Sequence, residues 1–309
     1  MAALIVNAII AVMKFIVAFF SGSASLFSEA IHSCADTFNQ VVLLIGKQQA
    51  RRRPDATHPF GYARATFFSS FCVAALLFFV GGAYSLMEAI EKINHTIHNT
   101  GMHTLDMKAL WIAAIILIIS IVLECFSFRT ALHEVEEEQK KTGEKKGLLK
   151  FYKDTRNSSL IVVVTEDLAA IIGLGLALAG VLLTLFTGNP LWDAIGGAAI
   201  GVLLIVSAFV LGKEIASLII GEALPEERIK VIEEIVKNAK HVKSCKKIKS
   251  VALGTDNILI EIDVVFETDG SASAEDVMNS IAEIKLAIKA EWENDPDTYV
   301  STCIEAVSA

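Results

Sequence analysis

Residues 25–47 read SLFSEAIHSCADTFNQVVLLIGK. Most of this stretch is small, apolar or hydroxylic, and its length suits the roughly 20 residues that a helix needs to cross a bilayer. It also holds an imidazole and two carboxylates, those of His32, Glu29 and Asp36. A charged side chain at membrane depth costs at least about 2.5–3.5 kcal/mol on insertion scales, so it is normally kept only beside a cavity or a partner. The stretch therefore predicts a membrane-spanning helix with a polar site on one face.

The composition of the 309-residue chain indicates several such spans. The chain is 53% hydrophobic, and its mean hydropathy of +0.54 is too high for an ordinary soluble protein. Six stretches are candidate spans, at about 2–21, 25–47, 62–90, 108–130, 157–186 and 191–220. The sequence therefore predicts an α-helical integral membrane protein with six transmembrane helices within residues 1–221.

Basic residues predict the orientation of these spans. Three arginines at 51–53 follow the second span, and eight Lys and Arg residues lie within 129–156, after the fourth. The breaks at 21–24 and 187–190 carry none. The positive-inside bias then places both termini in the cytoplasm, or in the matrix of an organelle. The first apolar run is too long for a signal peptide and looks unlike a transit peptide, so we expect a prokaryotic inner (plasma) membrane, with an organelle membrane as the alternative.

The last part of the chain, residues 222–309, has the pattern of a soluble acidic module. It contains 18 acidic and 10 basic residues, which accounts for the whole net charge of −8 and argues against nucleic acid as a partner. Helical and alternating patterns predict an α-β-β-α-β order, a cytoplasmic α+β domain of ferredoxin-like type, with elements at about 226–239, 246–253, 257–267, 274–293 and 298–307. Ser273 and Asp276 resemble a cap for the second helix.

Ionisable residues inside the spans suggest a metal site. His32 and Asp36 lie four residues apart, so on a helix they share one face. Glu166 and Asp167 form a second cluster in the fifth span. An imidazole and carboxylates can supply a four-ligand shell for zinc or a related divalent ion, and we favour metal binding over mere interhelical hydrogen bonding. For Glu29 we favour a hydrogen bond or snorkelling.

Other polar groups have less specific interpretations. Lys14, Glu88 and Glu124 are expected at span ends or as partners between helices. Asn39 and Gln40 have two equally favoured interpretations: they line the same cavity as His32, or they lie outside it. The five cysteines form no CxxC pair, which favours isolated reduced thiols over a disulfide framework or a thiolate zinc site.

Five motifs together closely resemble the cation diffusion facilitator family: SGSASLFSEAIHSCAD (21–36), DATHPFGYARA (55–65), TEDLAAIIG (165–173), TGNPLWDAIGG (187–197) and GEALPEE (221–227). The resemblance covers essentially the whole chain, and it is greatest for the member-nine-like zinc transporter subgroup of solute carrier family 30. It implies a six-span, two-fold homodimer in the lipid bilayer that exports divalent metal, usually zinc, in exchange for protons.

The resemblance also implies a ligand set. The family uses two residues four apart on the second span, which fall on His32 and Asp36, and two on the fifth, which fall on Val163 and Asp167. Val163 cannot bind a metal. Either the adjacent Glu166 supplies the fourth ligand, although it points about 100° around the helix from Asp167, or water completes a three-ligand site.

Two further family sites are incomplete in this sequence. In the loop after the second span, Asp55 and His58 match two ligands but Tyr62 stands at the third, so we expect a capped turn, with a weak second metal site as the alternative. In the cytoplasmic domain few candidate ligands remain, namely His241, Cys245, Cys303 and Glu305. We expect a dimerisation module without metal. His95, His98 and His103 are expected in a solvated loop.

The leading interpretation is thus a secondary transporter rather than an enzyme, with a transported ion, Zn²⁺ before Fe²⁺, Mn²⁺ or Co²⁺, and no tightly bound cofactor. Protons compete for the same groups, because ligands must lose their protons to bind metal. An intramembrane metalloprotease would need a string such as HExxH, which the sequence lacks. A metal-responsive membrane scaffold that transports nothing remains as the alternative of a different class.

Overall fold

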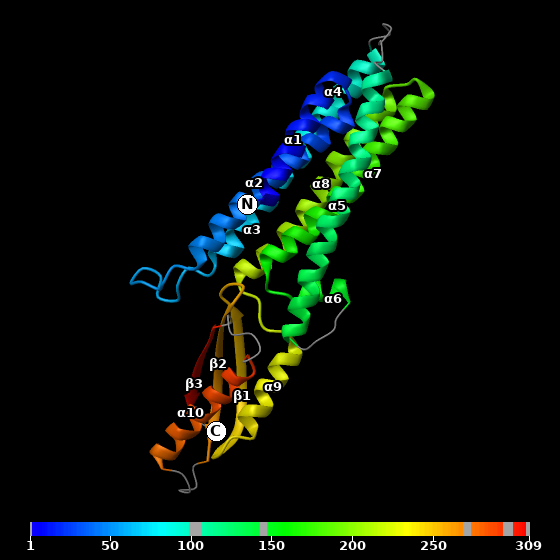
Figure 1. The fold of residues 1–309 in the computed structure, drawn as a ribbon. Coiled ribbons are helices and arrows are strands. Elements are labelled where there is room, and N and C mark those ends of the chain that lie inside the picture. Colours follow the sequence, from blue (N-terminus) through cyan, green and yellow to red (C-terminus); the bar gives the residue numbers. More distant parts are fainter. Residues whose placement is uncertain (1, 99–106, 143–146, 268–272, 293–298, 307–309) are drawn as a thin grey trace. The chain divides into compact units, whose positions relative to one another are not determined.

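The computed structural model describes residues 2–98, 107–142, 147–267, 273–292 and 299–306 (Figure 1). The chain divides into two compact units. The first, here the helical unit, comprises residues 1–47, 68–135 and 159–215. The second, here the mixed unit, comprises residues 48–67, 136–158 and 216–309. The domain boundary predicted at 221/222 stays a prediction.

Long helices supply most of the helical unit: α1 (Ala2–Ser21), α2 (Ala24–Ala50), α3 (Ala65–Leu76), the π-helix η1 (Leu77–Tyr84), α4 (Ser85–His98), α5 (Met107–Thr142), α7 (Ser158–Thr187) and α8 (Leu191–Ile220). Within the described residues, four helical stretches are long and apolar enough to cross a membrane, at 65–98, 107–140, 158–187 and 191–220. Four of the six predicted spans are therefore confirmed as apolar helices of sufficient length. The spans predicted at α1 and α2 stay predictions, and polar residues lower the hydropathy of the 27-residue α2.

Glycines bring the helices of this unit close together. A Cβ atom at Gly82 of η1 would lie 2.6 Å from Cγ1 of Ile205 on α8, and one at Gly201 would lie 2.8 Å from the backbone nitrogen of Leu86 on α4. Lipid tails are as apolar as leucine, so spanning helices associate through such close packing rather than through the hydrophobic effect. Buried leucines, including Leu77 of η1, fill the remaining space of this core.

The mixed unit contains a three-stranded sheet (Figure 1). Its strands β1 (Val242–Ala252), β2 (Asn257–Phe266) and β3 (Tyr299–Ala306) lie in the order β1-β2-β3, with β1–β2 antiparallel and β2–β3 parallel. The predicted apolar face of β2 is confirmed. It packs against Ile232 and Val236 of α9 (Glu226–Lys237) and Ile284 and Ile288 of α10 (Ala274–Ala290) in one buried cluster.

The α-β-β-α-β order is confirmed, whereas a ferredoxin-like fold stays a prediction. The capping box at Ser273 is present: its side chain accepts a hydrogen bond from the Asp276 amide, and the Asp276 carboxylate accepts one from the Ser273 amide. The strand predicted from 246 begins earlier, at Val242. Register shifts at Val242/Ser244 and Cys245/Lys247 interrupt the alternation of inward and outward side chains. The alternating sequence pattern therefore did not reveal the first residues of this strand.

The close approach of α8 to α4 generates a stability test. We expect Gly201→Ala to lower the apparent melting temperature of the full chain in detergent by about 5 °C, because overpacking a close contact costs about 1–3 kcal/mol. Gly175→Ala is the matched control, since a Cβ atom there meets nothing within 4 Å. Equal melting temperatures for the two variants would show that α4 and α8 do not depend on this contact.

Candidate functional site

The polar face of α2 leaves hydrogen-bonding atoms without partners. The His32 side chain is 1% exposed, and its Nδ1 lies 3.4 Å from Oδ1 of Asp36. Neither ring nitrogen of His32, nor Oδ1 of Asp36, makes a hydrogen bond within the described part of the chain. A buried polar group left unsatisfied costs about 1–3 kcal/mol. These atoms are therefore available to a ligand, as are buried oxygens of Ser28, Glu29 and Asn39 on the same helix that also make no hydrogen bond within the described residues.

The two carboxylates of α7 contact different helices. Oε1 of Glu166 accepts a hydrogen bond from Nδ2 of Asn39 on α2 at 2.5 Å, and Glu166 also interacts electrostatically with Asp36. Oδ2 of Asp167 instead accepts a hydrogen bond from the Ser127 hydroxyl of α5 at 3.0 Å. Adjacent helical residues point about 100° apart, which explains the separation. In this conformation Glu166 is the carboxylate of the pair that contacts α2.

The predicted ligands do not all lie close to one another in this structure. Among the described residues, no three histidine, cysteine, aspartate or glutamate side chains lie close enough to share a metal ion. The structure brings His32 and Asp36 together, places Glu166 beside Asn39, and holds Asp167 against α5. A shift or rotation of α7 against α2 would change which of the two carboxylates approaches His32.

A buried ion pair lies next to the site. Nζ of Lys14 on α1 donates a hydrogen bond to the Ser33 hydroxyl at 2.7 Å and lies 3.6 Å from Oε2 of Glu29, and the Lys14 and Glu29 side chains are each 1% exposed. Lys14 is therefore an interhelical partner, as predicted, and Glu29 does not snorkel. A Cβ atom at Gly173 of α7 would lie 2.6 Å from Oε1 of Glu29, so that glycine makes room for the carboxylate.

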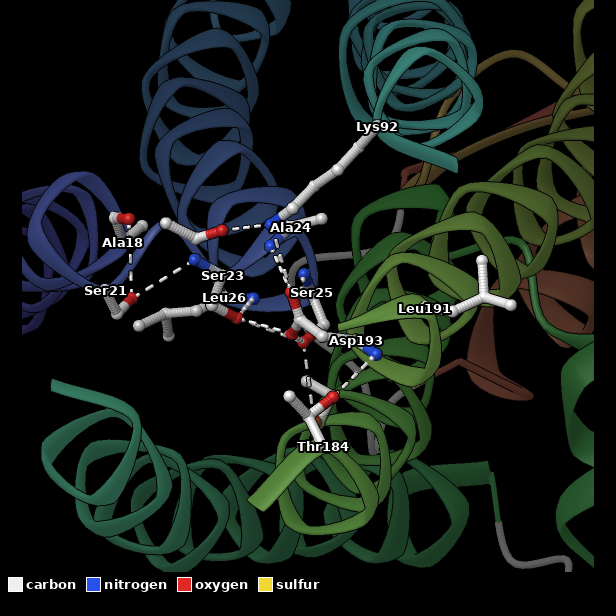
Figure 2. A network of polar contacts seen from close by, with 12 residues as sticks. Ala18, Ser21, Ser23, Ala24, Ser25, Leu26, Lys92, Thr184, Leu191 and Asp193 are labelled. Atoms are coloured by element: carbon white, nitrogen blue, oxygen red, sulfur yellow. Dashed lines mark hydrogen bonds and ion pairs between the residues drawn. The ribbon is translucent and has the colours of Figure 1, made fainter. Parts of the chain in front are cut away.

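Sequence reasoning missed the polar network around Asp193 at the start of α8 (Figure 2). Its carboxylate accepts hydrogen bonds from the hydroxyls of Ser23 and Ser25 and from the amides of Ala24, at 2.5 Å, and Ser25, at 3.4 Å. Nζ of Lys92 on α4 lies 3.2 Å from the same carboxylate and also donates to the carbonyl oxygen of Gly22. The amide of Asp193 donates to the Thr184 hydroxyl of α7 at 3.0 Å.

This network caps one helix with a side chain from another. The carboxylate meets the N-terminus of α2, where the backbone amides lack helical partners and the helix dipole favours negative charge. The Lys92 ammonium meets a carbonyl just past the C-terminus of α1, where the dipole favours positive charge. No local pattern showed that the capping acid would come from a residue so far along the chain.

In the mixed unit, the loop after α2 holds the incomplete second ligand set. Oδ2 of Asp55 accepts a hydrogen bond from the Tyr62 hydroxyl at 2.6 Å, while Oδ1 accepts from the amides of Thr57 and His58. The hydrogen bond from Tyr62 is the main cause that lowers the pKa of Asp55 below its ordinary value, and it raises the pKa of Tyr62. Nδ1 of His58 lies 3.7 Å from Oδ1 of Asp55. Tyr62 thus contacts the carboxylate that a metal would need.

Of the remaining candidate ligands of the mixed unit, His241 lies in the turn directly before β1, and the others lie on β1 and β3. Cys245 belongs to β1 and packs against the core, whereas Cys303 and Glu305 belong to β3, and β2 lies between these strands. Neighbouring strands are about 4.8 Å apart, so β1 and β3 are separated by about 10 Å. Burial raises the pKa of the Cys245 thiol, which disfavours the thiolate that binds metal. His95 and His98 are exposed as predicted, but they lie in the last turns of helix α4 rather than in a loop, and His103 lies outside the described residues.

The chain is similar to known proteins over most of its length. The model of the cation efflux transmembrane domain matches residues 1–220, which is most of the chain. The chain belongs to the cation diffusion facilitator (cation efflux) family. It is therefore an integral membrane protein of a transporter family, in agreement with its apolar helices.

Several relatives are similar over most of this chain. The human proton-coupled zinc antiporter SLC30A9, mitochondrial, is 30% identical over 271 residues, covering 86% of this chain and 45% of that protein. This chain thus spans about half the length of that relative. The uncharacterized transporter MJ0449 of Methanocaldococcus jannaschii is 25% identical over 294 residues, 93% of this chain and 90% of that protein. The manganese efflux system protein MneS of Bacillus subtilis is 21% identical over 287 residues, 93% and 88% respectively.

The Asp193 network generates a second stability test. Asp193→Ala removes the cap of α2 and leaves Lys92 without its carboxylate, so we expect a loss of about 2–4 kcal/mol, or about 5–10 °C in apparent melting temperature. Thr187→Val is the control, because that hydroxyl lies exposed on α7, where it donates to the carbonyl of Leu183 in its own helix and accepts from the nearby amide of Asn189. If thermal unfolding in detergent shifts equally for both variants, the network does not hold α2.

Proposed function

We propose that this protein is a secondary transporter that exports a divalent metal ion, most favourably Zn²⁺, in exchange for protons by alternating access. The observation that carries the proposal is the pair of His32 and Asp36, whose buried nitrogen and oxygen atoms have no hydrogen-bonding partner among the described residues of a cation efflux domain. An imidazole with carboxylates is a donor set that zinc accepts. The similarity to a proton-coupled zinc antiporter supports the choice of ion.

In this proposal the ion is held between α2 and α7. Nitrogen of His32 and oxygen of Asp36 come from α2, and Glu166 and Asp167 are the carboxylates that α7 can supply. Glu166 completes the shell in place of Val163, with water as the alternative. Because metal ligands must be unprotonated, protons that arrive at the carboxylates and the imidazole displace the ion, and this competition couples the two flows.

The membrane topology and the assembly of the proposed transporter follow those of the family. Six spans, including α1 and α2, cross the bilayer, and the arginines at 51–53 place both termini on the cytoplasmic side, in the inner membrane of a prokaryote or in an organelle membrane. Two copies form a homodimer through a cytoplasmic domain at residues 222–309. This domain binds no metal, since Cys245 lies on β1 whereas Cys303 and Glu305 lie on β3, and the Asp55 loop is a capped turn.

Two alternatives rest on specific features. Similarity to a manganese efflux protein favours Mn²⁺, with Fe²⁺ and Co²⁺ as further candidates for the same mechanism. A metal-responsive scaffold that transports nothing would use the same ion site without flux. Metal-by-metal flux measured with the purified chain in proteoliposomes separates these possibilities, because a scaffold moves no ion.

The first functional test removes the ligands of α2. We expect His32→Ala and Asp36→Ala each to abolish zinc-coupled proton flux in proteoliposomes and to weaken zinc binding at least about 100-fold, because even residues that only support a ligand contribute about 10–100-fold. Cys34→Ser is the control, since Cys34 lies on the exposed side of the same helix. Robust zinc flux by a well-folded Asp36→Ala protein would refute the assignment of the site.

A second test separates Glu166 from water as the fourth ligand. If Glu166 binds the ion, Glu166→Gln weakens zinc binding nearly as much as Asp167→Asn does. Val163→His then restores a ligand at the position that the family uses, so the affinity or ion preference is expected to shift towards that of family members with the complete ligand set. The side-chain amide introduced by Glu166→Gln can still accept the hydrogen bond from Asn39, so the fold is expected to survive. Calorimetric titration of these variants decides the matter: affinity equal to that of the parent chain in Glu166→Gln leaves water as the fourth ligand.

A further inference from the structure

Lys14 places a basic side chain beside the proposed ion site. Its ammonium is buried between α1 and α2, bonded to the Ser33 hydroxyl, which belongs to the residue directly after His32. The ammonium interacts electrostatically with His32 and Asp36 as well as with Glu29. A lysine at this depth is expensive to retain. Helix association alone does not require a charge so close to a site that has to attract a cation.

The two members of the ion pair differ in freedom of movement. The Glu29 carboxylate is confined by the backbone of Gly173, where even a Cβ atom would lie 2.6 Å from Oε1. The Lys14 ammonium stands at the end of a flexible four-carbon chain. Glu29 also lies near the carboxylate of Glu124 on α5, and Asp36 lies near those of Glu166 and Glu124. The helical unit therefore gathers several carboxylates around one internal cation.

We propose that Lys14 is a tethered counter-cation that sets the metal affinity of the site formed by His32, Asp36 and the α7 carboxylates. When the ion is bound, the ammonium repels it and keeps binding weak enough for release. When the ion has left, the ammonium offsets the negative charge that remains near Asp36. Glu29 holds the ammonium and partly cancels its repulsion. This inference rests on the proposed function and adds a residue that determines affinity without touching the ion.

The proposal predicts effects of opposite sign for the two partners of one ion pair. Lys14→Gln removes the repelling charge, so the full chain is expected to bind Zn²⁺ about tenfold more tightly. Glu29→Gln leaves the ammonium uncompensated, so binding is expected to weaken about tenfold. The double variant removes both charges, and its affinity is expected near that of the parent chain. An ion pair that only joins α1 to α2 would weaken binding in both single variants.

The experiment is calorimetric titration of the full chain in lipid nanodiscs with Zn²⁺ alone, at fixed pH. Lys14→Arg keeps the charge and is expected to bind within about threefold of the parent chain. Lys92→Gln is the matched control, because it removes another lysine of the helical unit that forms an ion pair with a buried carboxylate, that of Asp193, away from the His32 site. We expect it to leave zinc affinity unchanged. His32→Ala shows which binding belongs to the site.

The outcomes are separable. Tighter binding by Lys14→Gln together with weaker binding by Glu29→Gln supports the proposal, and weaker or unchanged binding by Lys14→Gln overturns it. If Lys14→Gln alone does not fold, the double variant is compared with Glu29→Gln, because these two proteins differ only in the Lys14 charge. The double variant then has to bind Zn²⁺ more tightly than Glu29→Gln. Binding that does not depend on His32 overturns the proposed function as well, whereas His32-dependent binding with effects of equal sign overturns only the role of Lys14.

Discussion

Every charge buried among the apolar helices needs a partner, and this constraint organises the helical unit. Lys14 meets Glu29, Lys92 meets Asp193, and Glu166 meets Asn39. Each contact joins two different helices, so the same polar groups that make insertion costly also determine which helices lie together. Gly173 has no side chain, so the backbone of α7 leaves room for the Glu29 carboxylate of one of these pairs.

The helix α2 is the centre of this arrangement because it is held at two levels. The Asp193 carboxylate caps its N-terminus, and the Lys14 ammonium contacts it further along, at Glu29 and Ser33. His32 lies eight residues, or about 12 Å, beyond Ala24. The unpartnered atoms of His32 and Asp36 therefore sit on a helix whose start is fixed from α8, which gives a ligand site a stable reference on one side.

The α7 side of the site is organised differently. Glu166 and Asp167 are neighbours in sequence, yet one contacts α2 and the other contacts α5. Because a helix separates adjacent side chains by about 100°, Asp167 has to leave Ser127 of α5 before both carboxylates can meet the ligands of α2. Such a rearrangement suits alternating access, which requires ligands that come together in one state and separate in another.

The amino-acid sequence by itself determined the class of protein, four apolar helices long enough to cross a membrane, the order of the elements in the mixed unit and the polar face of α2. These properties follow from local periodicity and hydropathy, which neighbouring residues are enough to specify. Only the tertiary structure decided which buried charges pair, that Glu29 is held by Lys14, that Asp193 caps a helix some 170 residues earlier, and which α7 carboxylate contacts α2. Such contacts join residues far apart in the chain, and side-chain direction depends on how the helices pack, so no local pattern carries them.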